Sequence, residues 1–490
     1  MTTPVARPRR TFPAPSRLAI SAVGVAVVAA LAACASAPAT PNTASADAPA
    51  QWHAPLPHGG ELAALGQWWR QFDDPLLVQL IDAAQQASAT VASARSRIEQ
   101  ARATRVAAGA ALLPTLDASA SASRGRQDLF SPLATSASAG VQAGWEIDAF
   151  GGRRAAKSAA ELRLGGAQAG WHDARVAVAA ETATSYTALR ACEAQLEQQR
   201  ADTASRAQTA RLTDLSAKAG FEAPASAALA RASAAQANSL LTQRRAQCDT
   251  LVKALVALTA QPEPALRLQL SGTTARVPQP AQLAVPAVPA QVLAQRPDVF
   301  IAERDLLAAS ADAAQARAQR WPSIRLGGSI GALRLDSGTS AQANGNNTGS
   351  VWSIGPVSVV LPLFDGGTRR ANVDAAQARV DESAALYRAR LRTAVREVED
   401  ALVTLQSTAD RAADAQTASE GFAVSLRATQ ARFSGGLASL FELEDARRSA
   451  VQAQVALIDL QRERSTAWID LYRALGGGWS AADVALATRP

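Results

Sequence analysis

Two stretches of this 490-residue chain are too long and too regular for an ordinary globular fold. From Arg369 to about Ala431 there is no proline and a single glycine, and the stretch from Arg153 to Gly220 is similar. A helix of about 60 residues extends about 90 Å at about 1.5 Å per residue. Apolar residues recur in the second stretch at heptad spacing, at Val373, Val380, Tyr387, Ala394 and Ala401. This pattern is typical of a coiled-coil seam, so we expect very long helices that pack closely.

The composition favours helices and gives little support for catalysis. Only 4% of the residues are aromatic, which argues against a large globular core, whereas alanine, leucine, arginine and glutamine favour helices. Three histidines and three cysteines leave little for a structural zinc site, an iron–sulfur cluster or a histidine-rich catalytic centre. We find no catalytic constellation, so we expect a protein that is not an enzyme and needs neither a metal nor a cofactor.

The positive charge of the chain is concentrated at its start. The formal net charge is +7, and four arginines but no acid precede residue 34, so the chain beyond that point carries +7 minus 4, or +3. The remaining arginines are mixed with acids on helical stretches and form no basic blocks interleaved with aromatics. We therefore do not expect nucleic-acid binding.

The N-terminus has the layout of a secretory leader. Residues 1–17 are basic, and residues 18–33 form an apolar run that is short for a membrane span. The run ends in LAAC at residues 31–34, which resembles the bacterial lipobox, although a leader could contain a cysteine by chance. We expect a signal peptide over 1–33, S-diacylglycerol and N-acyl (palmitate) groups on Cys34, and a lipid-anchored flexible tether over 34–60.

The rest of the chain repeats itself. Three correspondences share one and the same offset in the numbering: Arg153 with Arg369, Gly220 with Gly436, and Arg231 with Arg447. Each copy reads as helix, strand, loop, strand, long helix, turn and returning helix. We expect the first repeat over 61–270 and the second over 271–490, with the tips of two helical hairpins at Gly220 and Gly436.

Four segments alternate between apolar and polar residues, at about 115–124, 139–148, 323–334 and 351–362. Each is about as long as a tilted strand that crosses a bilayer, but soluble hairpins would show the same alternation. Four strands cannot close a membrane barrel, because the smallest known barrels need about eight, and open edges in lipid leave backbone groups unpaired. Strands that span a bilayer would have to be pooled with those of identical copies, and three copies would supply twelve.

Several short motifs stand out along the chain. The clearest is RPDV at 296–299, with Ala302-Glu303-Arg304 and an alanine-rich stretch up to Trp321-Pro322. The others are Trp68-Trp69, Phe72 and Asp74-Pro75-Leu76 near the start, and FDGG at 364–367 before the longest helix. In this order, and with the repeat, they resemble the motifs of the TolC-like outer-membrane efflux proteins, and among them the lipidated NodT-like branch.

The resemblance implies a mainly α fold with β: a homotrimer with a 12-stranded transmembrane β-barrel, four strands per protomer, and a coiled-coil α-helical barrel. It implies an exit duct of a tripartite efflux pump, lipid-anchored in the outer membrane, extending into the periplasm and passively conducting drugs or other small solutes. The implied partners are a periplasmic membrane-fusion adaptor, an inner-membrane transporter of the RND type, and outer-membrane lipid. A duct for ABC-type protein secretion remains open, as does a periplasmic coiled-coil scaffold without a pore.

The resemblance also implies a gate at the periplasmic tip, formed by acidic residues just after the second tip glycine. The matching residues are Glu442 and Asp445, with Glu444 between them. In a trimer each would give a ring of three negative charges, which is a plausible cation-selective constriction. A solvated acidic helix face is the alternative.

The two cysteines outside the leader give an expectation that is independent of the family. Cys192 lies as far before Gly220 in the sequence as Cys248 lies after it. Antiparallel helices that fold back near Gly220 would place both cysteines at the same height. A disulfide is then reasonable in an oxidising compartment if the Cα atoms approach within about 7 Å. Two small apolar residues in the helix seam are the alternative.

Overall fold

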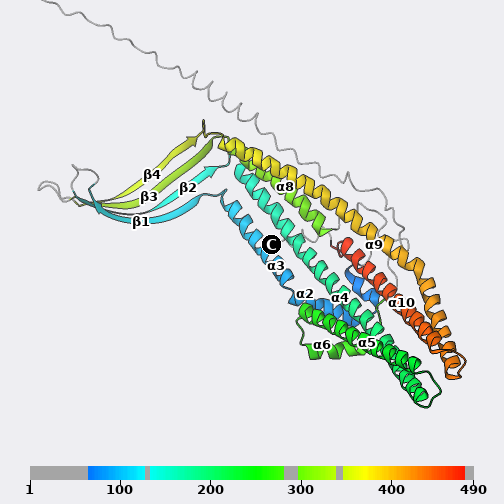
Figure 1. Cartoon of the computed structure of the whole chain (residues 1–490). Helices are drawn as coiled ribbons and strands as arrows, with labels where there is room; N and C mark the ends of the chain where they lie inside the picture. Colours follow the sequence, from blue (N-terminus) through cyan, green and yellow to red (C-terminus); the bar gives the residue numbers. More distant parts are fainter. Residues whose placement is uncertain (1–64, 127–132, 281–295, 338–345, 480–490) are drawn as a thin grey trace, which may run out of the picture. The chain divides into compact units, whose positions relative to one another are not determined.

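The computed structural model describes residues 65–126, 133–280, 296–337 and 346–479 and divides into two compact units (Figure 1). Within these residues, the β unit comprises Ala110–Ala156 and Ser310–Ala376. The helical unit comprises the remaining described residues, and each unit is considered by itself.

Helices account for most of the described residues. They are α2 (Pro75–Ala87), α3 (Ala89–Ala110), α4 (Gly152–Lys218), α5 (Pro224–Thr259), α6 (Glu263–Leu270), α8 (Pro297–Ala318), α9 (Thr368–Ser434) and α10 (Leu440–Ala474). Two 3₁₀ helices cover Leu65–Phe72 and Ser271–Thr273. Within the described ranges, no helix combines the length and the apolar character needed to cross a bilayer.

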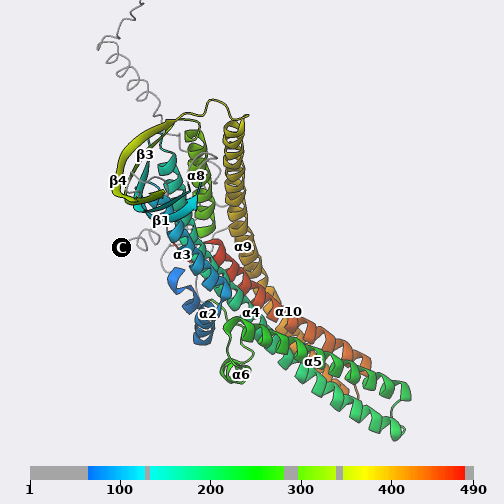
Figure 2. The same ribbon diagram turned by 90° about the vertical axis from the view of Figure 1, so that its left-hand side faces the viewer.

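The four strands form one antiparallel sheet in the order β1-β2-β3-β4. They are β1 (Thr115–Gly125), β2 (Ala134–Ile147), β3 (Ser323–Ser337) and β4 (Asn346–Val360). The β2–β3 pair joins the hairpin of the first half of the chain to that of the second half. Strands β1 and β4 are the two edges of this sheet, which Figures 1 and 2 show as a curved ribbon.

The strands reach further toward the hairpin turns than the sequence suggested. Strand β2 begins at Ala134, five residues before the expected start, and β3 continues to Ser337. The glycine- and serine-rich composition there indicated a loop, but serine hydroxyls bond across the strands at Ser121–Ser138 (2.9 Å) and Ser123–Ser136 (2.7 Å). Such cross-strand pairs stabilise the ladder where larger side chains are missing.

Helices α4 and α9 have 67 residues each, and their bounds are related by the same offset as the sequence motifs. An aspartate precedes each helix and bonds its first turn. The Asp148 carboxylate accepts hydrogen bonds from the backbone N–H groups of Arg153 (3.0 Å) and Arg154 (2.9 Å), and Asp365 accepts one from Arg369 (3.1 Å). A carboxylate at this end of a helix accepts hydrogen bonds from N–H groups that otherwise have no partner. Its negative charge also interacts favourably with the positive end of the helix dipole.

Both long helices end in the same glycine turn. Gly220 has a φ of +83° and Gly436 a φ of +72°, a left-handed conformation that costs glycine little because it has no Cβ. The closing bonds run from Phe221 N–H to the Ser216 carbonyl (2.9 Å) and from Leu437 N–H to the Arg432 carbonyl (2.8 Å). The chain then returns along α5 and α10.

The core of the helical unit explains the aromatic motif near the start of the chain. Trp68 is 1% exposed, and its ring lies 6.1 Å from that of Trp468 and 5.5 Å from that of Tyr472. The Tyr186 hydroxyl donates a hydrogen bond to the carboxylate of Asp74 (2.7 Å). Burial, together with this bond, raises the pKa of Tyr186 to about 12. The motif therefore packs the start of the described chain against α4 and α10.

Candidate functional site: the two-faced sheet and the hairpin tips

The register of the sheet sorts its side chains into two faces, because opposite residues of antiparallel strands lie on the same face. One face, called here the apolar face, carries the rows Ala118–Val141–Ile330–Trp352, Leu116–Ala143–Gly328–Ile354 and Trp145–Leu326–Val357. Trp352 is 71% exposed and Ile354 is 91% exposed in the single chain. Large apolar side chains exposed together indicate a surface that something else covers.

The opposite side, called here the polar face, carries mainly small and polar residues, although Val351, Leu333 and Leu335 also lie on it. Its rows are Asp117–Gln142–Ser329–Ser353, Ser119–Gly140–Gly331–Val351 and Glu146–Arg325–Ser358. The hydroxyls of Ser329 and Ser353 are hydrogen-bonded to each other at 2.9 Å. The sheet therefore separates an apolar surface from one that suits water.

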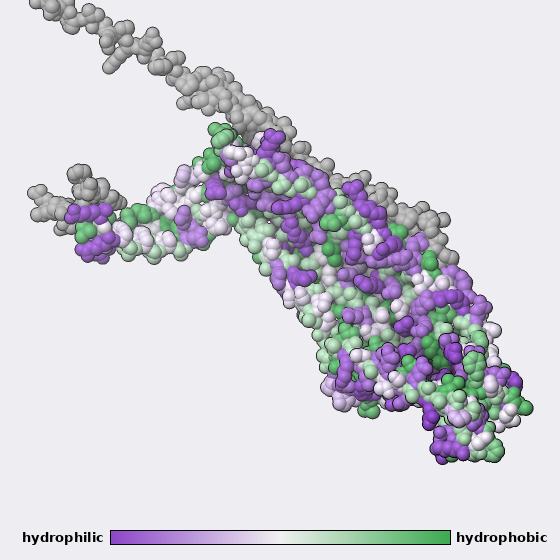
Figure 3. All heavy atoms as spheres, in the orientation of Figure 1, coloured by the Kyte–Doolittle hydropathy of each residue, from purple (hydrophilic) through white to green (hydrophobic). Residues whose placement is uncertain are grey.

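The apolar face has a limited height. It runs from Ile147 to the row of Ala139, which is about 27 Å along the strand at about 3.4 Å per residue. Beyond that row Arg334 and Asp336 take the place of apolar residues, and Figure 3 shows hydrophilic residues at the left-hand end of the sheet. Outer-membrane barrels carry an apolar band of comparable height, about 25 Å.

Two facing glycines show toward which side the sheet bends. Gly140 and Gly331 lie opposite each other on the polar face. A Cβ on Gly331 would lie 2.6 Å from the Ala139 carbonyl oxygen, and one on Gly140 would lie 2.9 Å from that of Ile330. The backbones of β2 and β3 therefore approach closely on the polar side. Glycine permits this approach because it has no Cβ, and such crowding is expected where a sheet curves toward its polar face.

At the second tip, Glu442 closes the start of α10. Its N–H donates to the Ser439 hydroxyl (3.2 Å), and its carboxylate accepts from the Ser439 N–H (2.7 Å). This backbone bond is the main cause of a lowered pKa for Glu442, so the carboxylate is ionised at neutral pH. Asp445 is exposed, and its carboxylate lies 3.9 Å from the Arg448 guanidinium. Their expected role in a gate stays a prediction.

The structure corrects the expectation for Glu444. Its side chain is buried and accepts hydrogen bonds from Ser233 (2.7 Å), from Arg447 (2.8 Å) and from Arg206. Arg447 also donates to two hydroxyls of α4. Through these bonds Glu444 joins α4, α5 and α10. Because its carboxylate is paired with the guanidinium groups of Arg206 and Arg447, it offers no free charge for an acidic ring. The sequence could not reveal this, since Arg206 and Ser233 belong to the other repeat, far from Glu444 along the chain.

The structure joins Cys192 of α4 to Cys248 of α5 in a disulfide, with a Cα–Cα distance of 5.6 Å. Both residues lie in the core of the helical unit, with exposed fractions of 6% and 7%. In the second repeat, the corresponding positions, at the offset that relates the two tip glycines, are Thr408 and Arg464. Only the first hairpin therefore has this crosslink.

The RPDV motif forms a buried ionic cluster. The Arg296 guanidinium donates two bonds to Asp298 (2.9 and 2.6 Å), one to Glu397 (2.6 Å) and one to the Ala474 carbonyl (2.8 Å), and Arg390 pairs with Asp298 at 2.9 Å. Burial alone would raise the pKa of Asp298, but the bonds and charge of Arg296 outweigh it and hold that pKa below its ordinary value. The motif thus ties the start of α8 to α9 and to the end of α10.

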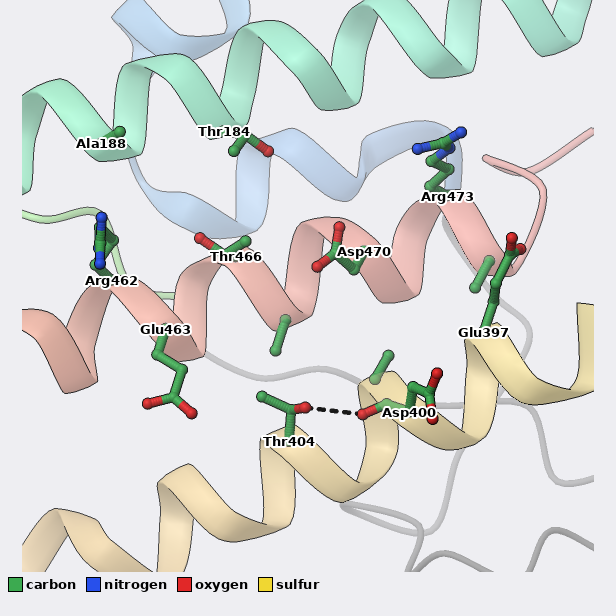
Figure 4. Close-up of a pocket in the computed structure, with 13 residues that line it drawn as sticks. Thr184, Ala188, Glu397, Asp400, Thr404, Arg462, Glu463, Thr466, Asp470 and Arg473 are labelled. Carbon is green, nitrogen blue, oxygen red and sulfur yellow. Dashed lines mark hydrogen bonds between the residues drawn. The ribbon is translucent and has the colours of Figure 1, made fainter. Parts of the chain in front are cut away.

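A groove of about 530 Å³ lies between α4, α9 and α10 (Figure 4). Its charged lining comes from Glu397 and Asp400 of α9 and from Arg462, Glu463, Asp470 and Arg473 of α10. Glu397 is held by Arg296 and Glu463 by Arg411 (2.7 Å), so two of the carboxylates already have partners. Among the described residues, no group of three or more histidine, cysteine or acidic side chains could hold a metal ion.

The chain matches the family model described as outer membrane efflux protein at residues 80–261 and again at 288–477. It is 30% identical over 451 residues to the solvent efflux pump outer membrane protein SrpC of Pseudomonas putida, covering 88% of this chain and 93% of that protein. It is 28% identical over 430 residues to nodulation protein T of Rhizobium leguminosarum bv. viciae, covering 86% of each.

A solved structure of the outer-membrane channel OprN has the same fold. The TM-score is 0.78 and the identity is 25%, and the match covers 90% of this chain and all of that one. The mainly helical architecture with a small sheet is therefore shared with outer-membrane channels.

Arg296→Ala should destabilise the helical unit strongly. It leaves Asp298 and Glu397 without their main partner, and breaking a buried pair costs about 3–5 kcal/mol. The measurement is the thermal unfolding midpoint in detergent, with Arg392→Ala as the control because Arg392 is exposed on α9. Equal midpoints for the two variants would contradict a structural role for the cluster.

Cys192→Ser should release one reactive thiol at Cys248. Denatured wild-type protein should take up no alkylating reagent at these residues without reductant, whereas the variant should take up one equivalent, as read by mass spectrometry. In the chain-entropy model, a crosslink between residues 56 apart contributes up to about 4 kcal/mol, so the variant should also unfold at a lower temperature. Labelling of unreduced wild-type protein at both cysteines would rule out the crosslink.

Proposed function

We propose, since the chain belongs to the outer membrane efflux protein family, that it is the trimeric outer-membrane exit duct of a tripartite efflux pump. It would passively conduct drugs or other small solutes. The observation that carries this proposal is the four-stranded sheet with one apolar face and two open edges.

The open edges favour assembly with further copies. In lipid each unpaired backbone group would cost several kcal/mol, and a four-stranded sheet cannot close on itself. Pairing β1 of one copy with β4 of the next removes both edges, and three copies give a barrel of twelve strands. The apolar face would then meet lipid, and the polar face, toward which Gly140 and Gly331 let the sheet bend, would line the lumen.

The duct itself would perform no chemistry and would need no cofactor. An inner-membrane transporter, which we propose is of the RND type, would supply the energy. A periplasmic adaptor would join this transporter to the duct. The name of the relative SrpC, a solvent efflux pump component, supports this arrangement. The chain would be an outer-membrane lipoprotein that extends into the periplasm.

The lipid anchor would be on Cys34, which lies outside the described residues together with the signal peptide and the tether. The thioether to diacylglycerol requires the cysteine sulfur. Cys34→Ser should therefore abolish incorporation of labelled palmitate in cells, while the protein is still made. Palmitate incorporation at the wild-type level would show that the anchor is elsewhere.

Glu442 and Asp445 would form the acidic rings at the periplasmic tip. The paired variant Glu442→Gln, Asp445→Asn removes both charges and keeps hydrogen-bonding groups, including a side chain able to cap Ser439. In planar bilayers it should be less selective for cations than the wild type, because the negative field at the constriction is lost. Unchanged selectivity would argue for an acidic helix face without a gating role.

The proposal is tested most directly by the oligomeric mass of the detergent-purified protein, from light scattering corrected for detergent, followed by conductance in planar bilayers. We expect a trimer that forms water-filled channels. A stable monomer would mean that the strands do not close a barrel. A trimer without conductance would point to a periplasmic coiled-coil scaffold.

A further inference from the structure

The polar face carries few charges. Within the four strands as the structure describes them, its charged residues are Asp117 on β1, Glu146 on β2 and Arg325 on β3. The other positions of this face are mostly serine and glycine, with Gln142 opposite Asp117. Such short side chains do little to shield a charge from solvent or from a passing solute.

The three charges are not equally balanced. The Glu146 carboxylate is bound by Arg153 at 2.9 Å and by Arg325 at 3.0 Å, which leaves one positive charge in excess. The nearby Asp148 pairs with Arg154 at 3.1 Å and adds no net charge. Asp117 is exposed, and no hydrogen bond or ion pair involves its carboxylate within the described part of the chain.

The two levels of charge are separated along the strands. Asp117 is opposite Gln142, whereas Arg325 is opposite Glu146, four residues further along β2. That distance is about 14 Å at about 3.4 Å per residue. It exceeds the screening length of about 8 Å at physiological ionic strength, so each level acts on a solute largely by itself.

We propose that Asp117 and Arg325 form two rings of opposite charge on the wall of the duct, and that the Asp117 ring makes this part of the duct prefer cations. The inference rests on the proposed function, because three copies with the polar face inward turn each residue into a ring of three. It assigns a selectivity element to the β-barrel that is separate from the acidic residues at the hairpin tip.

The test is the ratio of potassium to chloride permeability, from reversal potentials of the full-length protein in bilayers under a KCl gradient. Asp117→Asn should lower the ratio at least about twofold. A charge about 7 Å away in water shifts the free energies of the two ions by close to RT in opposite directions, and salt screening reduces each shift to roughly 0.4 RT. Arg325→Gln should raise the ratio.

Each variant is also measured together with Glu442→Gln, Asp445→Asn, so that the charges at the tip do not mask the effect. Asp336→Asn, on the apolar face, is the matched control and should change nothing.

A second variant tests the location of the charge. With Asp117→Cys, attachment of a sulfonate-bearing thiol reagent should restore the wild-type ratio, and attachment of a trimethylammonium reagent should lower it below that of the neutral cysteine. In Ala118→Cys, whose side chain would face lipid, the same water-soluble reagents should have no effect.

The outcomes separate this inference from the proposed function. Channels that open normally but keep an unchanged ratio in Asp117→Asn, or shift the same way in Asp117→Asn and Arg325→Gln, overturn the two rings and leave the duct intact. A wild-type protein that forms no channels removes the duct and the rings together.

Discussion

The unpaired backbone groups along the two edges of the sheet are the main constraint on the β unit, because they need hydrogen-bond partners. Strands β1 and β4 each have a partner on one side only, and the sheet exposes tryptophan, isoleucine and valine on one face. Edge strands of this kind are a liability in a soluble protein. In the proposed trimer, strand addition between copies would satisfy the edges, and lipid would cover the apolar face. The curvature at Gly140 and Gly331 and the division into two faces are consistent with the same solution.

The helical unit meets a different constraint, which is how long alanine-rich helices keep their register. Small side chains in a seam pack almost equally well after a shift of one turn, so apolar contacts alone define the register weakly. Buried ion pairs do not allow such a shift, because a displaced arginine would leave a carboxylate unpaired. The clusters around Asp298 and Glu444 therefore fix α8, α9 and α10 at one end and α4, α5 and α10 near the tips.

The sequence predicted those features that depend on neighbours along the chain. The long helices follow from the heptad pattern and the missing prolines, and the tips follow from glycines at which the backbone turns left-handed. The start of β2 was predicted five residues too late, because glycine- and serine-rich composition indicates a loop unless the facing strand is known. Glu444 was assigned to an exposed surface, although Arg206 and Ser233 from distant parts of the chain enclose it. Likewise, RPDV was recognised as a motif, but its partners Glu397 and Arg390 could not be found from local patterns.

The single crosslink between α4 and α5 makes the two repeats mechanically unequal. Where the first hairpin has a covalent bond, the second relies on non-covalent contacts such as Arg411–Glu463 (2.7 Å) and Ser419–Gln454 (2.6 Å). The Arg296 cluster fixes α9 and α10 at one end. Nearer the tip, exposed contacts such as Arg411–Glu463 resist shear less than a covalent crosslink does at the bridged height. Two hairpins of nearly equal length thus differ in stiffness, and a strain applied at the tips would be taken up mainly as shear between α9 and α10.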